Sequence, residues 1–173
     1  MHVAVLNGRC RIAAAAIAGF ALWLASAPGA RADVTVKIGF DFVETRVSPR
    51  QETYNSHISE SYKISTDKTV DFTRSNVNPA RVKLGEQMTG TNESGQTSTS
   101  KYQIVNGAVV ITTHNPGFYH VLKIVTDGRT SCSATRTYYR NPGHQYFEAL
   151  TGNGENVLAT NFEAQNMTCS IAE

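Results

Sequence analysis

The sequence predicts an all-β fold: a single antiparallel meander of about ten strands that forms a small β-barrel or a two-sheet β-sandwich. Three observations carry this prediction. Apolar and polar residues alternate with a period of two beyond residue 33. Turn-forming residues recur roughly every 10–14 positions, and no segment shows the apolar spacing of an amphipathic helix. A barrel or a sandwich buries one face of many short strands, so either satisfies the pattern.

Three segments show the alternation most clearly. Val34, Val36, Ile38, Phe40 and Phe42 alternate with polar or small residues, and the same period recurs over 58–64 and 81–88. Alternate side chains of a strand share one face, so each segment is expected to bury that face. Two polar stretches are expected to interrupt the strands, namely a loop at 51–56 and a mobile loop or hairpin tip at 88–100.

Turn signals divide the chain after residue 100. They are Asn106-Gly107, Asn115-Pro116-Gly117, Asp127-Gly128, Asn141-Pro142-Gly143, Gly152-Asn153-Gly154 and Gln165-Asn166. Asn-Gly favours a two-residue hairpin because both residues tolerate the positive φ of a type I′ turn. Alternate turns of a meander lie at the same end, so the two Asn-Pro-Gly turns and Gln165-Asn166 are expected to share one rim.

Residues 1–32 have the three parts of a cleavable signal peptide. Arg9 and Arg11 precede an apolar run over 12–25, and Ala30-Arg31-Ala32 offers small residues before a cut at Asp33. The run is shorter than the roughly 20 residues of a spanning helix, so no transmembrane segment is expected after cleavage. Residues 33–173 are then a single all-β domain. The Ala-rich signal is bacterial in style, which predicts a periplasmic or secreted protein.

Signal cleavage changes the charge balance. The full chain has 16 basic and 14 acidic residues, and the signal contains three arginines and no acidic residue. The remaining 13 basic and 14 acidic residues give a net charge of −1. This charge does not indicate a basic nucleic-acid-binding surface, so no nucleic-acid partner is expected.

Two cysteines remain after cleavage, Cys132 and Cys169. An isolated pair in an oxidising compartment predicts a disulfide. The loop it would close predicts a stabilisation of about 3–4 kcal/mol. Two free thiols or a redox pair are the alternative, but the Cys-x-x-Cys spacing typical of redox pairs is missing.

The rim of the Asn-Pro-Gly turns carries most of the chemically versatile side chains. Among them are His114, His120 and His144, which would form a metal site if their imidazoles converged. The alternative is that these polar and aromatic residues cap the end of the barrel. No Gly-x-Ser-x-Gly motif supports a hydrolase.

Strand parity also places two charges on predicted core faces. Arg136 shares a face with Cys132, Ala134 and Tyr138, and Glu60 shares one with Tyr62. A charge on such a face needs a partner or a cavity. Three alternatives are open: a buried Arg136–Glu60 ion pair, a site where Arg136 binds the anionic head of a ligand, or a bulge that turns Arg136 outward.

The sequence therefore favours a binding module over an enzyme. The expected partner is a small amphipathic or anionic ligand, or a protein, and no cofactor is expected. The candidate ligand-binding residues are Arg136, Glu60, Tyr138, Tyr119 and Arg140. The alternative is a small secreted metal-dependent or hydrolytic enzyme that uses the histidine-rich rim.

Overall fold

A computed structural model describes residues 33–65, 69–74, 77–91, 95–151 and 154–172. This part of the chain is all-β, with strands in two antiparallel sheets that together form a half-barrel. The predicted fold class is therefore confirmed. The predicted signal peptide lies outside the described residues. Among the residues that are described, no helix is long and apolar enough to cross a membrane.

Each sheet is described by its strands. Sheet A has the order β10-β11-β1-β2-β3-β4 and contains β1 (Val34–Ser48), β2 (Glu52–Ile64), β3 (Thr69–Arg74), β4 (Val77–Lys83), β10 (Phe147–Leu150) and β11 (Asn156–Ala172). Sheet B has the order β5-β6-β7-β8-β9 and contains β5 (Gln87–Thr91), β6 (Thr97–Val105), β7 (Ala108–His114), β8 (Phe118–Thr126) and β9 (Cys132–Arg140).

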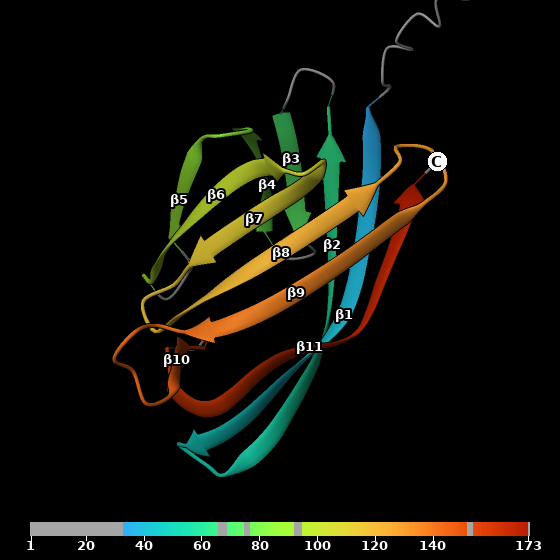
Figure 1. Ribbon diagram of the computed structural model, residues 1–173. Helices are drawn as coiled ribbons and strands as arrows, with labels where there is room; N and C mark the ends of the chain where they lie inside the picture. Colours follow the sequence, from blue (N-terminus) through green and yellow to red (C-terminus); the bar gives the residue numbers. More distant parts are fainter. Residues whose placement is uncertain (1–32, 66–68, 75–76, 92–94, 152–153, 173) are drawn as a thin grey trace, which may run out of the picture.

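The two sheets are successive parts of one meander that the last long strand closes. β1 to β4 and β5 to β9 pair in chain order, and β11 returns to pair with β1. Strand pairing is interrupted between β4 and β5 and again after β9, which separates the two sheets. The strands of sheet B cross over those of sheet A (Figure 1). The predicted disulfide is confirmed: Cys132 and Cys169 join β9 to β11, with their Cα atoms 5.5 Å apart.

The core lies between the inward faces of the sheets. Its larger cluster contains Val34, Val36, Ile38, Phe40, Tyr62, Val70, Val82, Tyr102, Val109, Ile111, Leu122 and Ile124. A smaller cluster of Phe147, Ala159 and Phe162 packs near the Asn-Pro-Gly turns, and Phe42 touches both clusters. Each fully buried aliphatic or aromatic side chain contributes about 1.5–3 kcal/mol, so these faces account for most of the stability.

The predicted rim is confirmed for the two Asn-Pro-Gly turns. The side-chain amide of Asn141 donates hydrogen bonds to the carbonyl oxygens of Asn115 (3.1 Å) and Pro116 (2.7 Å). The first turn also packs against β10: a Cβ on Gly117 would lie 2.3 Å from the carbonyl oxygen of Glu148, so only glycine fits there. The Asn106-Gly107 hairpin is confirmed as well, since both residues have positive φ.

Two local predictions are wrong and a third is right in part. Gln165-Asn166 is not a turn: β11 continues through it, and Asn166 has a φ of 51° at a break in the β1–β11 register. Residues 52–56 belong to β2 and not to a loop. The predicted loop or hairpin tip at 88–100 is a hairpin whose arms are β5 and β6; residues 92–94 lie outside the described residues. Polar sequence does not exclude a strand, because Ser, Thr and Asn suit a face exposed to water.

Candidate functional site

The interior ion pair is formed by Arg136 of β9 and Glu60 of β2. The guanidinium donates two hydrogen bonds to the carboxylate, one from Nη1 to Oε1 at 3.1 Å and a second from Nη2 to Oε2. Their side chains are only 5% and 3% exposed. The register explains this burial: Arg136 pairs with Leu122 and Glu60 pairs with Ile38, both core residues. Both charges therefore point inward, and no bulge turns Arg136 out.

Aromatic groups complete the surroundings of this pair. The Tyr62 hydroxyl donates a hydrogen bond to Glu60 Oε2 at 2.9 Å, and the Arg136 guanidinium lies 4.5 Å from the centre of the Phe40 ring. A cation over an aromatic ring in a desolvated site is stabilised electrostatically. The charges are thus held by a carboxylate, a hydroxyl and a ring face.

The environment of the pair shifts the pKa of several groups. Burial by itself would lower the pKa of Arg136, but the Glu60 carboxylate together with Tyr62 and Tyr138 outweighs burial and raises this pKa. Burial, and then the same carboxylate, raises the pKa of Tyr62 well above its ordinary value and that of Tyr102 to about 12. At neutral pH the arginine therefore stays charged and both phenols stay protonated.

One polar atom of the pair is unsatisfied. Arg136 Nε is buried and has no hydrogen-bond partner among the described residues. A buried donor without an acceptor costs about 1–3 kcal/mol. The guanidinium therefore retains one N–H group that an additional acceptor would stabilise.

A polar row crosses sheet B next to the interior ion pair. Its members pair directly across β6, β7, β8 and β9 and are all half-buried: Ser100, Thr113, His120 and Tyr138. The Ser100 and Thr113 hydroxyls are 2.9 Å apart, and the ring centres of His120 and Tyr138 are 5.4 Å apart. Tyr138 also contacts Phe42 and Phe118. The inward face of sheet B thus carries a polar row between the larger core cluster and Phe118, whose ring packs against Phe162 nearer the Asn-Pro-Gly rim.

The structure divides the predicted ligand-binding residues among three places. Arg136, Glu60 and Tyr138 face inward as predicted. Tyr119 lies on the opposite, outer face of sheet B, stacked between His114 and Tyr139. Arg140 donates a hydrogen bond from Nη1 to the carbonyl oxygen of Gln145 at 2.5 Å, so it holds the β9–β10 connection.

The three histidines of the predicted metal site do not converge. His114 pairs with Tyr119 and His120 pairs with Thr113, so consecutive register positions place the two imidazoles on opposite faces of sheet B. His144 lies 3.0 Å from a Glu148 oxygen instead. Over the described residues, no group of three His, Cys, Asp or Glu side chains is arranged to hold a metal ion. His114 and His120 are close in sequence, but successive positions along a strand point to opposite faces, so their rings are separated.

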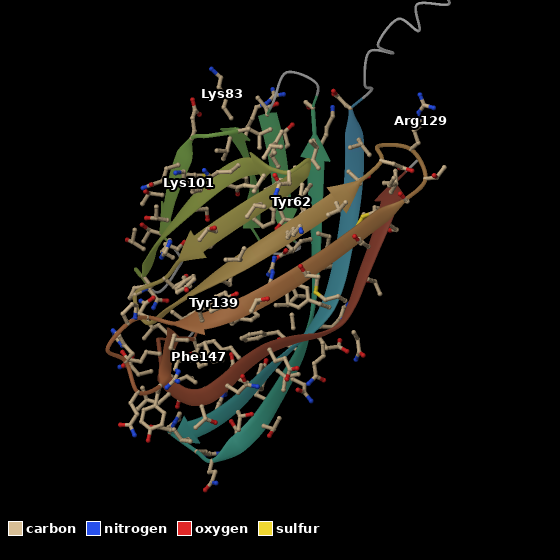
Figure 2. The ribbon with its side chains drawn as sticks, in the orientation of Figure 1. Tyr62, Lys83, Lys101, Arg129, Tyr139 and Phe147 are labelled. Carbon is tan, nitrogen blue, oxygen red and sulfur yellow. A yellow bond between two sulfur atoms is a disulfide. The ribbon has the colours of Figure 1, made fainter. Side chains whose placement is uncertain are left out.

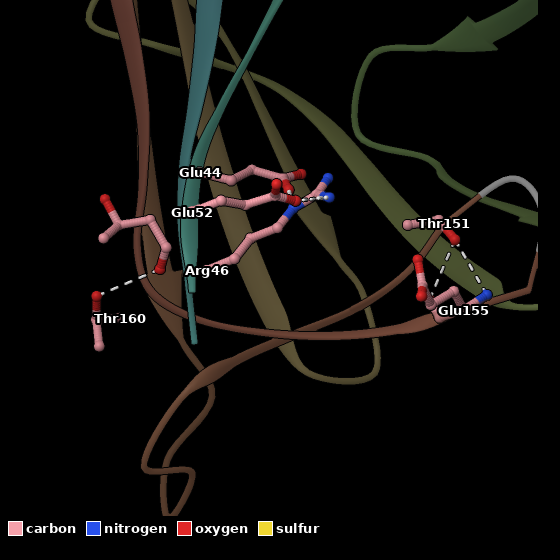
Figure 3. A network of polar contacts seen from close by, with 7 residues as sticks. Glu44, Arg46, Glu52, Thr151, Glu155 and Thr160 are labelled. Carbon is pink, nitrogen blue, oxygen red and sulfur yellow. Dashed lines mark hydrogen bonds and ion pairs between the residues drawn. The ribbon is translucent and has the colours of Figure 1, made fainter. Parts of the chain in front are cut away.

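Sequence reasoning missed a second charged cluster on the inward side, next to the turn of the β1–β2 hairpin (Figure 3). Arg46 contacts Glu44 through Nε at 2.6 Å and Glu52 through Nη1 at 3.2 Å. Its guanidinium also lies 4.3 Å from the centre of the Tyr54 ring. The signal was present, because Glu44 and Arg46 continue the parity of Val34 to Phe42.

A third cluster on the outer face of sheet A was also missed. The two carboxylate oxygens of Asp41 contact His57 Nδ1 at 2.9 Å and the Asn166 side-chain amide at 2.8 Å. The hydrogen bonds from Asn166 and then from His57 lower the pKa of Asp41. Both interactions are exposed, so this cluster ties β2 and β11 to β1 at the surface.

Comparisons with known proteins add no identity: no protein-family model, no curated protein and no solved structure matches this chain.

Proposed function

We propose that this protein is an exported bacterial binding module without catalytic activity, which holds a small amphipathic molecule between its two sheets. Three features support it. The inward face of sheet B places a polar row next to the apolar core cluster, aromatic rings lie beside that row, and the buried Arg136 Nε has no acceptor among the described residues. An amphipathic molecule presents an apolar body and a polar end, which matches this order.

The unsatisfied Arg136 Nε carries the proposal. A ligand oxygen placed near it would accept the remaining hydrogen bond and remove the cost of a buried unpaired donor. Glu60 already neutralises the guanidinium through two hydrogen bonds. The ligand group at this position is therefore a neutral acceptor, such as a carbonyl or hydroxyl, and the anionic head expected earlier is replaced.

Native mass spectrometry of the protein purified from its own host tests this function. We expect an additional mass of a few hundred daltons or so, within the usual size of a pocket ligand, that disappears under denaturing conditions. The double variant Arg136→Met/Glu60→Leu removes the unpaired donor while it leaves an apolar pair, and it should lose the additional mass.

The matched control is Arg46→Gln, which changes an arginine at the other end of the inward side and should retain the ligand. Circular dichroism establishes that each variant is folded. Identical native and denatured masses for the wild-type protein contradict the proposed function, as does ligand retention by the folded double variant.

A further inference from the structure

The two sheets differ in their acidic residues. β5 to β9 contain no Asp or Glu, and every acidic residue that lies in a strand belongs to sheet A. The chain from residue 33 onward nevertheless carries a net charge of −1. Sheet B is therefore locally cationic on a protein that is weakly anionic, and its outer face is the surface on which this charge is exposed.

The outer face of sheet B carries two lysines without ion pairs. Lys101 of β6 and Lys123 of β8 are exposed, and neither takes part in an ion pair within the described part of the chain. On the outer face of sheet A, Lys63 pairs with Asp33 and Arg81 with Asp71, whereas Lys37 takes part in no ion pair within the described residues. The remaining outward positions of β6 to β9 are mostly Thr, Ser, Gln and Val.

A row of nearly parallel aromatic rings crosses the same face. The ring centres of His114 and Tyr119 are 5.2 Å apart at an angle of 25°, and those of Tyr119 and Tyr139 are 4.8 Å apart at 14°. Tyr139 is 42% exposed. Tyr139 on β9 and Lys101 on β6 mark opposite sides of the sheet in Figure 2. Rings already ordered by their neighbours lose little freedom when a ligand binds, so this row is preorganised.

We infer that the outer face of sheet B binds an acidic polysaccharide. Tyrosine combines an apolar ring with a hydroxyl, which matches the C–H groups and hydroxyls of a sugar ring. Thr, Ser and Gln side chains supply further hydrogen-bond donors and acceptors. Lys101 and Lys123 would attract the carboxylates of successive sugars, and no carboxylate on β5 to β9 would repel them.

Other partners fit this face less well. A second copy that docked symmetrically through this same face would bring lysines against lysines, which like-charge repulsion opposes. A nucleic acid is recognised through many phosphate contacts, whereas this face carries two lysines and the mature chain has a net negative charge. Two acidic residues border sheet B in the described chain. Glu86 precedes β5, and its backbone carbonyl accepts a hydrogen bond from the Tyr102 N–H next to Lys101. Asp127 accepts hydrogen bonds from its own β8–β9 turn, at the strand ends away from the aromatic row.

Affinity electrophoresis and calorimetry of the mature protein with alginate, a uronic-acid polymer, test this inference. We expect retardation by alginate, none by neutral dextran, and weaker binding as salt is raised. The variants Lys101→Gln/Lys123→Gln and Tyr119→Ser/Tyr139→Ser should each reduce alginate affinity at least tenfold. Lys37→Gln/Lys63→Gln, on the outer face of sheet A, is the matched control and should change it less than twofold.

Four outcomes overturn the inference: no binding to alginate, equal binding to dextran, tighter binding to single-stranded DNA than to alginate, or an equal loss in the sheet A control. Unchanged affinity after loss of the tyrosines also contradicts it, because the charges alone would then explain binding. This face lies opposite the inward polar row, so failure here leaves the small-molecule proposal intact, and the native mass measurement tests that separately.

Discussion

Two arginines on the inward side of this protein each pair with a glutamate and lie over an aromatic ring, but they differ in how deeply they are buried. Arg136 pairs with Glu60 and lies over Phe40, while Arg46 pairs with Glu44 and Glu52 and lies over Tyr54. The side chains of the first pair are 5% and 3% exposed, whereas Arg46 and Glu44 are 11% and 12% exposed and Glu52 is 46% exposed.

The two clusters also differ in what they connect. Arg136 and Glu60 join sheet B to sheet A, whereas Arg46 and its partners all belong to the β1–β2 hairpin. Depth decides how strongly each charge depends on its partner, because water cannot replace a lost partner in the core. Substitutions in the interior pair should therefore weaken the association of the two sheets, whereas substitutions in the Arg46 cluster should affect only the β1–β2 hairpin.

The largest expected effect comes from breaking the interior pair. Glu60→Gln leaves the Arg136 guanidinium buried without a counter-ion and should reduce the free energy of unfolding by about 3–5 kcal/mol. Urea denaturation followed by circular dichroism measures this. The matched change Glu44→Gln should cost less than half as much. Equal losses for the two variants would show that depth does not separate the clusters.

Removing the disulfide is expected to have the next largest effect. Cys132→Ala/Cys169→Ala deletes the covalent link between β9 and β11 and should cost about 2–4 kcal/mol. Because Arg136 lies on β9, this change should be non-additive with Glu60→Gln and additive with Glu44→Gln. A double-mutant cycle from urea unfolding measures both combinations. Full additivity with Glu60→Gln would contradict a shared role in holding the sheets together.

A smaller effect is expected from Arg46→Gln. The Arg46–Glu44 pair is largely buried, but the Arg46–Glu52 pair is half-exposed, and such pairs contribute about 0.2–1 kcal/mol that salt screens. The loss of unfolding free energy should therefore shrink between 0.05 and 1 M NaCl, an interval over which the Debye length falls to about 3 Å. The Glu60→Gln loss should hardly change over the same interval. If the loss caused by Arg46→Gln does not depend on salt, the Arg46 cluster is as shielded from solvent as the Arg136–Glu60 pair, which contradicts the prediction.

The smallest effect extends the comparison to a fully exposed carboxylate. Backbone N–H groups of Ser131, Arg129 and Thr130 lower the pKa of Asp127 below its ordinary 3.8. A lowered pKa in the folded state means that the ionised group stabilises the fold above about pH 4 and loses this contribution as the pH falls through the folded pKa. Asp127→Asn should therefore lower the melting temperature at pH 6 more than at pH 2. Equal shifts at both pH values would contradict the assignment.

The interior ion pair shows how far sequence reasoning reaches. Period-two alternation places Arg136 and Glu60 on core faces. Because a buried charge needs a partner, their pairing is one of three alternatives that the sequence leaves open. Alternation cannot choose among them, because residues 76 positions apart meet only through the packing of two sheets. The unsatisfied Arg136 Nε is likewise invisible without coordinates, since it depends on what surrounds one atom.

The histidine rim shows where local reasoning fails. The Asn-Pro-Gly turn correctly brings His114 and His120 onto neighbouring strands, but the hairpin register pairs His114 with Tyr119. A shift of one position reverses the face of a strand residue, so the two imidazoles separate. Gln165-Asn166 fails for a related reason: Asn tolerates positive φ in a bulge as well as in a turn.

The sequence by itself determined the all-β class, the Asn106-Gly107 and Asn-Pro-Gly turns, the Cys132–Cys169 pair and the inward parity of Arg136. Each depends on spacing within a segment or on the small number of available cysteines. Only the tertiary structure decided that β11 closes onto β1, that Arg136 meets Glu60, that the histidines diverge and that a cationic aromatic face remains on sheet B. These features depend on the register and packing between distant strands, which no local pattern encodes.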